Sequence, residues 1–140
     1  MPTLPWTPSG ELGVTPARVT VMGSRLELKS YFAIPGFFRA AFKVRRQVRE
    51  APGAIGVALI AQPSRKTFWT LSAWTDQSAL HRFVATSPHR EVMAKYGPRL
   101  VGSGFQTFEI DASEIPAKNS NARDLWAEAK RRLAVPPEAT

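Results

Sequence analysis

The sequence predicts an α+β fold, and three observations lead to this prediction. Apolar residues alternate or run continuously in four β-like segments, at 19–28, 54–62, 67–74 and 103–110. Apolar residues at helical spacing lie between the first and second of these segments, and again between the third and fourth. The order β-α-β-β-α-β, with only four residues between the second and third strands, is that of a ferredoxin-like domain with an antiparallel four-stranded sheet.

The helices carry their own local signals. The helix at 34–50 has Pro35 in its first turn, where proline is tolerated, and it stops before a proline-glycine pair. The helix after the third strand has Asp76 as its expected N-cap, with Thr75 as the alternative. Ser87-Pro88 interrupts that helix, and a second helical segment follows.

The composition indicates a globular protein of one domain. The chain has 140 residues, of which 44% are hydrophobic and 21% are charged. It has no cysteine, which excludes disulfides, thiolate nucleophiles and cysteine-ligated metals, and which fits a reducing compartment. No segment approaches the ~20 apolar residues of a membrane helix, and the N-terminus lacks the pattern of a signal peptide. We expect a cytoplasmic protein with no membrane partner.

Three regions divide the chain. Residues 1–17 carry four prolines and form an extended arm, in which Trp6 packs onto the domain or onto a neighbouring subunit. Residues 18–112 form the ferredoxin-like domain. Residues 113–140 hold a polar linker, a C-terminal helix at 122–133 and a Pro-Pro tail. This helix has an apolar stripe that covers either a partner subunit or the mouth of a cavity.

The two middle strands are apolar on both faces, although the predicted helices cover only one face. Residues 54–62 are almost continuously apolar, and the strand at 67–74 places Trp69 and Trp74 on opposite faces. We therefore expect a second sheet to cover the bare face, as a twofold homodimer would allow. The space enclosed by such an assembly would be a ligand cavity.

The positive charge favours anionic partners. The formal net charge is +8, and five basic residues and no acid lie between Arg39 and Arg49. A solvated helix face is the alternative explanation for this cluster. Nucleic acid is not an expected partner, because dimerisation would bury the sheet on which bases would have to stack.

The segment from Phe68 to Met93 resembles the dimeric α+β barrel superfamily, typified by the antibiotic-biosynthesis monooxygenases. The shared features are a strand that ends in Trp74, an acid-capped helix with Phe83 near its end, and the Ser-Pro-His-Arg step. The resemblance covers roughly residues 18–112. It implies a dimeric α+β barrel and a homodimer.

The same resemblance implies a site. Cofactor-free members of the family oxidise polyketide-like phenols, and tryptophan, arginine and polar side chains hold the substrate anion. We therefore expect a monooxygenase-like protein that binds a hydrophobic or aromatic anionic substrate in a cavity between the helices and the sheet. The catalytic candidates are Arg25, Trp74 and His89, and the substrate-binding candidates are Ser24, Trp69, Phe83, Met93 and Gln106. Alternatively, both tryptophans are core residues and Arg25 pairs with Glu27 or Glu109.

We expect the protein to bind no cofactor, and haem is the alternative. Haem-degrading members use an Asn, Trp and His set, where this chain has Ser24 (or Arg25), Phe83 and Met93, so none of the three matches. Two histidines without cysteine make a zinc site improbable. The remaining functional alternatives are a haem-binding enzyme of this fold and a non-enzymatic dimeric module that binds a ligand or regulates a partner.

The two histidines have different expected roles. His81 is expected to face solvent. His89 lies in the first turn of a helix, where the helix dipole disfavours protonation. It could therefore ligate haem iron or accept a proton, or it could bond to a neighbouring backbone group.

Overall fold

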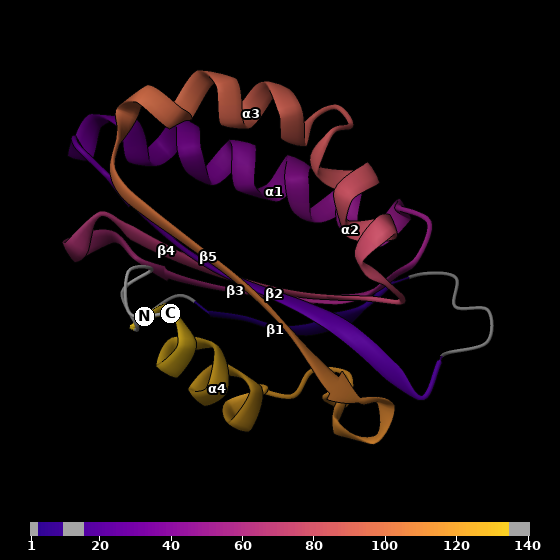
Figure 1. Cartoon of the computed structure of the whole chain (residues 1–140). Helices are drawn as coiled ribbons and strands as arrows, with labels where there is room; N and C mark the ends of the chain where they lie inside the picture. Colours follow the sequence, from indigo (N-terminus) through magenta and orange to yellow (C-terminus); the bar gives the residue numbers. More distant parts are fainter. Residues whose placement is uncertain (1–2, 10–15, 135–140) are drawn as a thin grey trace.

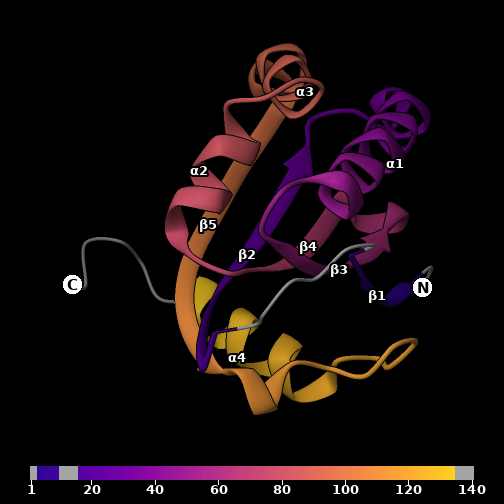
Figure 2. The same cartoon turned by 90° about the vertical axis from the view of Figure 1, so that its right-hand side faces the viewer.

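The computed structural model describes residues 3–9 and 16–134, which form one antiparallel sheet with helices on both faces (Figures 1 and 2). The strands, in the order β1-β3-β4-β2-β5 across the sheet, are β1 (Thr3–Pro8), β2 (Arg18–Leu28), β3 (Ala54–Gln62), β4 (Thr67–Trp74) and β5 (Leu100–Asp111). One face, called the helix face, carries α1 (Ile34–Glu50), α2 (Gln77–Val84) and α3 (His89–Tyr96). The opposite face, called the α4 face, carries α4 (Arg123–Leu133). The predicted α+β, ferredoxin-like fold is confirmed.

Most predicted boundaries agree with the structure. Helix α1 and strands β3 and β4 begin and end at the predicted residues. Asp76 caps α2, because its Oδ1 accepts a hydrogen bond from the Ala79 amide at 2.8 Å. Strand β5 begins at Leu100 instead of residue 103, because Gly102 and Leu100 continue the ladder opposite Glu27 and Leu28 of β2. None of the helices in the described ranges has the length and hydropathy needed to span a membrane.

The proline-rich arm contributes a fifth strand that the prediction of four strands did not include. Strand β1 pairs with β3, and its Trp6 is 1% exposed on the chain's own domain. The Trp6 ring lies over Gly56, where a Cβ would be 2.5 Å from the indole, so only glycine leaves room for it. The Trp6 amide also donates to the Ser120 carbonyl at 2.9 Å. Residues 1–2 and 10–15 of the arm, like the predicted tail at 135–140, lie outside the described residues.

Helix α4 covers the sheet face that the predicted helices left bare. Its Trp126 and Ala129 are buried in one cluster with Val21 of β2 and Leu71 of β4. The helix approaches β2 closely at Gly23, where a Cβ would lie 3.0 Å from the Ala129 Cβ. The second apolar face of the middle strands is therefore buried by the chain's own C-terminal helix, which corrects the expectation that a second sheet is needed there.

On the helix face, by contrast, the core divides into two clusters. At one end Phe37 of α1 packs against Phe68 and Tyr96, with ring centroids 4.7 and 5.1 Å away. At the other end Trp74 packs against Phe83, with ring centroids 4.8 Å apart. The site described below lies between these two clusters.

Candidate functional site

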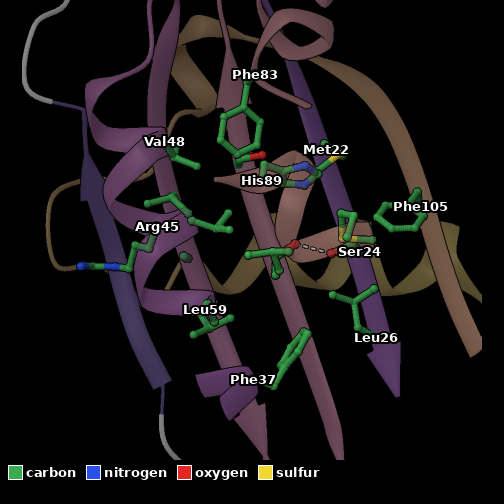
Figure 3. Close-up of a pocket in the computed structure, with 18 residues that line it drawn as sticks. Met22, Ser24, Leu26, Phe37, Arg45, Val48, Leu59, Phe83, His89 and Phe105 are labelled. Atoms are coloured by element: carbon green, nitrogen blue, oxygen red, sulfur yellow. Dashed lines mark hydrogen bonds between the residues drawn. The ribbon is translucent and has the colours of Figure 1, made fainter. Parts of the chain in front are cut away.

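An apolar cavity lies between the helices and the sheet, in the gap between the two clusters (Figure 3). Its volume is about 80 Å³. Strands β2, β3 and β4 form its floor, and helices α1, α2 and α3 form its roof. Phe105 of β5, which is 45% exposed, lines its side towards solvent. Most other lining side chains are apolar, including Met22, Leu26, Phe37, Val44, Val48, Leu59, Phe83, Val92 and Met93.

Three hydroxyl groups interrupt the apolar floor. Ser24 of β2 and Thr70 of β4 are opposite one another in the ladder, and their hydroxyls are hydrogen-bonded to each other. Only one of the two hydrogens is used in that bond, so the pair retains one O–H for a ligand. Ser72 accepts a hydrogen bond from the Trp74 indole N–H at 2.9 Å, which leaves its own O–H available too. The floor therefore presents two O–H groups to the cavity, one from the Ser24–Thr70 pair and one from Ser72.

His89 is the buried titratable side chain of the roof. It is 8% exposed, and its ring packs against Phe83 with centroids 4.9 Å apart. Its Nδ1 lies 3.2 Å from the Val84 carbonyl oxygen. Burial lowers the pKa of His89 below its ordinary value of 6.5, although the bond to Val84 raises the pKa in part. In the neutral tautomer that donates Nδ1–H to Val84, Nε2 carries a lone pair and can accept a proton.

Gln47 of α1 holds the segment that carries His89. Its amide nitrogen donates to the carbonyl oxygens of Phe83 and Thr86, both at 3.2 Å. Its amide oxygen accepts from the His89 backbone N–H at 2.8 Å. This side chain therefore fixes the start of α3, and with it the position of the imidazole, relative to α1.

Arg45 of α1 contributes its stem to the cavity, while its guanidinium points away towards β1 (Figure 3). Its Nη2 donates to the Thr7 hydroxyl at 2.7 Å, and its buried Nε has no hydrogen-bond partner. Burial, and to a smaller extent the charge of Arg49, lowers the pKa of Arg45. Arg45 therefore ties α1 to β1 and does not place its charge in the cavity.

Four of the residues selected from the sequence line this cavity: Ser24, Phe83, His89 and Met93. A fifth, Trp74, is fully buried behind the wall, where it contacts Phe83 and bonds to Ser72. The structure thus brings these five residues together around one space.

The other three candidates lie on the α4 face. Trp69 is opposite Arg25 in the ladder, and Gln106 is opposite Gly23, which faces α4. Arg25 forms an ion pair with Glu27 at 3.0 Å and lies 5.6 Å from the centre of the Trp69 ring. The Trp69 indole donates to Gln62 at 2.9 Å. Because successive side chains of a strand alternate between faces, none of the three reaches the cavity between the helices and the sheet.

Sequence reasoning missed Thr70 and Ser72 as members of the site. A signal was present, because both lie on the face of the β4 sequence that also carries Phe68 and Trp74. Two small hydroxyls between two buried aromatic residues indicate a polar spot on an apolar floor. Elsewhere, His81 is exposed as expected. Within residues 3–9 and 16–134, no three His, Asp or Glu side chains gather where they could hold a metal ion.

Solved structures with the same fold were found, whereas no protein-family model and no curated protein matches the sequence. A point mutant of SnoaB from Streptomyces nogalater, a cofactor-independent oxygenase, is 17% identical with a TM-score of 0.54, over 66% of this chain and 92% of SnoaB. An antibiotic biosynthesis monooxygenase is 17% identical with a TM-score of 0.56, over 70% of this chain and 99% of that one. A conserved protein from Methanosarcina mazei Go1 is 10% identical with a TM-score of 0.59, over 66% of this chain and 92% of that one.

At these low sequence identities, the similarity is evidence for the fold alone. It nevertheless agrees with the resemblance seen in the sequence between Phe68 and Met93, which was drawn from residues and not from coordinates. The chain therefore has the α+β fold of the antibiotic biosynthesis monooxygenase-like proteins.

Proposed function

We propose that this protein is a cofactor-independent monooxygenase that oxidises an aromatic phenol in the cavity between its helices and its sheet. The observation that carries the proposal is a buried His89, whose pKa is lowered by burial, beside an apolar space with hydroxyl donors on its floor. SnoaB, which has the same fold, is described as a cofactor-independent oxygenase, and this supports the reaction class.

The residues divide the chemistry between them. His89 Nε2 takes a proton from the substrate, and the O–H groups of the Ser24–Thr70 pair and of Ser72 stabilise the resulting oxyanion. The apolar walls exclude water, which favours transfer of one electron from the phenolate to O₂ over protonation of the phenolate. Trp74 acts as a positioning residue through Phe83 and Ser72.

The atoms balance without an external reductant for a phenol whose keto form has an acidic CH₂ group. The phenolate and O₂ form a radical pair, which combines into a C–O bond to give a peroxide. The peroxide takes the proton from the His89 imidazolium. Loss of the remaining C–H proton then breaks the O–O bond and releases water, so that R₂CH₂ and O₂ become R₂C=O and H₂O.

Haem does not fit this site well. His89 Nε2 is the atom that an axial ligand would use, but the imidazole is 8% exposed, its ring packs against Phe83, and Met93 lines the same space. A porphyrin ring would have to displace both side chains. We therefore expect added haem to produce no Soret shift.

Oxygen consumption with anthrone tests the proposal. We expect one O₂ to be consumed for each anthraquinone formed, without added flavin and without inhibition by a chelator. Oxygen uptake no faster than in buffer would contradict an oxygenase. If anthrone raised the Tm of the protein without any oxygen uptake, the same cavity would instead belong to a non-enzymatic binding module.

We also propose that the protein is a homodimer that closes the open side of this cavity. Strand β5 is an edge strand of the sheet, and on its helix face Val101 is 60% exposed and Phe105 is 45% exposed. A second copy on this edge would bury both side chains.

Sedimentation velocity at micromolar concentration tests the homodimer. We expect a mass of about twice the chain mass of 15.5 kDa. The double variant Val101→Asp/Phe105→Asp should sediment as a single chain. The variant Phe42→Asp, at an exposed aromatic residue of α1, should remain a dimer. A wild-type mass of one chain would refute the homodimer.

A further inference from the structure

A second concave region, which we call the basic groove, adjoins the cavity. It lies between the second half of α1 and the connection between α2 and α3, and its volume is about 570 Å³. Its lining includes three basic side chains, Lys43 and Arg46 of α1 and Arg82 of α2, and a single carboxylate, Glu50. The groove is therefore wide, open and positively charged.

The three cations of the groove are available to a ligand. All three are exposed, and in the part of the chain that the structure describes none of them forms an ion pair. Other basic residues of the chain are paired, such as Arg18 with Asp111 at 2.9 Å. Three unpaired cations against one carboxylate give this groove a potential that attracts anions.

One residue, Phe83, is shared by the linings of the groove and the cavity. Its ring contacts Trp74 on one side and His89 on the other. Gln47 also lines the groove, and it is the residue that bonds to the backbone of Phe83 and His89. A ligand that spans the two spaces past Phe83 would have its apolar part beside His89 and its other end among the cations.

We propose that the basic groove is an anion subsite that binds a carboxylate attached to the aromatic ring system of the substrate. This inference rests on the proposed function and narrows it to aromatic carboxylic acids. The planar guanidinium groups of Arg46 and Arg82 can each bind a carboxylate with two parallel hydrogen bonds, and Lys43 adds a third positive charge. A neutral phenol of the same shape makes none of these contacts, so the groove discriminates between the two ligands.

Two probes of equal shape and different charge test the subsite: 2-naphthoate and 2-naphthalenemethanol. Binding is measured by calorimetry at low salt, and we expect wild-type protein to bind the carboxylate about tenfold more tightly than the alcohol. The double variant Arg46→Gln/Arg82→Gln should lose this preference and still bind the alcohol as before. Raising the salt concentration should weaken binding of the carboxylate only.

The matched control removes the same charge elsewhere. Arg39 and Arg90 are exposed and lie outside the groove, so Arg39→Gln/Arg90→Gln should keep the preference for the carboxylate. Equal affinity for the two probes in wild-type protein would overturn the proposal. The proposal would also fail if Arg39→Gln/Arg90→Gln lost the preference for the carboxylate as fully as Arg46→Gln/Arg82→Gln does. Displacement of 2-naphthoate by a single-stranded oligonucleotide would reassign the groove to nucleic acid and also overturn it. Binding of the alcohol alone would overturn the subsite and leave the proposed function standing. Binding of neither probe would also overturn the subsite, and oxygen uptake with anthrone would decide the proposed function separately.

Discussion

Replacement of His89 by glutamine is expected to lower the rate of oxygen consumption by about 10²–10⁴-fold, the usual contribution of a general base. Glutamine keeps a polar side chain of similar size but cannot accept a proton at neutral pH. Binding of the substrate should change little, because the apolar walls and the Ser24–Thr70 pair remain. An oxygen electrode measures the rate, and the shift of Tm with ligand measures binding.

The other histidine provides the control for this variant. His81 lies on α2 and is exposed, so His81→Gln removes an imidazole of the same chain without touching the cavity. It should retain the wild-type rate. Equal rates for His89→Gln and wild-type protein would show that His89 is not the base.

The pH dependence gives His89 a second, independent signature. Because burial lowers its pKa, the neutral base is retained below pH 6.5, and the acid limb of the rate profile should lie below that value. The unfolded chain binds this proton at higher pH than the folded protein does. The His89 contribution to the free energy of unfolding is therefore fully present above pH 6.5 and is lost as the pH falls through the lowered pKa. Both effects should be absent in His89→Gln.

Replacement of Trp6 by alanine is expected to lower the free energy of unfolding by about 3–5 kcal/mol. The indole is 1% exposed, lies over Gly56 and belongs to the same cluster as Trp126 of α4. Its loss leaves a cavity where the arm, the sheet and the C-terminal segment meet. Urea unfolding followed by circular dichroism measures the change.

An exposed aromatic residue serves as the comparison for Trp6. Phe32 is 96% exposed, so Phe32→Ala should alter the free energy of unfolding by less than about 0.5 kcal/mol. If Trp6→Ala were equally mild, the arm would not be part of the core, and the fifth strand would contribute little to stability.

Elements with strong local signals could be predicted from the sequence. Helix α1 has a regular apolar stripe and a first-turn proline, and strands β3 and β4 are bounded by clear turn residues. Strand β1 has no such signal, because its prolines suit an irregular arm as well as an edge strand. Its pairing with β3 and the burial of Trp6 over Gly56 depend on residues about fifty positions away.

Part of the candidate site could be predicted from the sequence, because it depends on local alternation and helical spacing. Ser24, Phe83, His89 and Met93 line the cavity because the alternation of β2 and the spacing of α2 and α3 direct them to the helix face. Arg25, Trp69 and Gln106 were selected by residue type alone, although the period of two in their strands directs them to the opposite face.

The amino-acid order by itself determined strands β2 to β5, the helices and the order in which they follow one another, because spacing and turn chemistry are local properties. Strand β1 is the exception. Only the tertiary structure decided which segment covers each face of the sheet. From the sequence, the apolar stripe of α4 was expected to cover a partner subunit or the mouth of a cavity. In the structure it packs on its own sheet instead, with Ala129 close over Gly23. The cavity beside His89 has the same origin, because it lies where two separately packed clusters leave a gap that no single segment encodes.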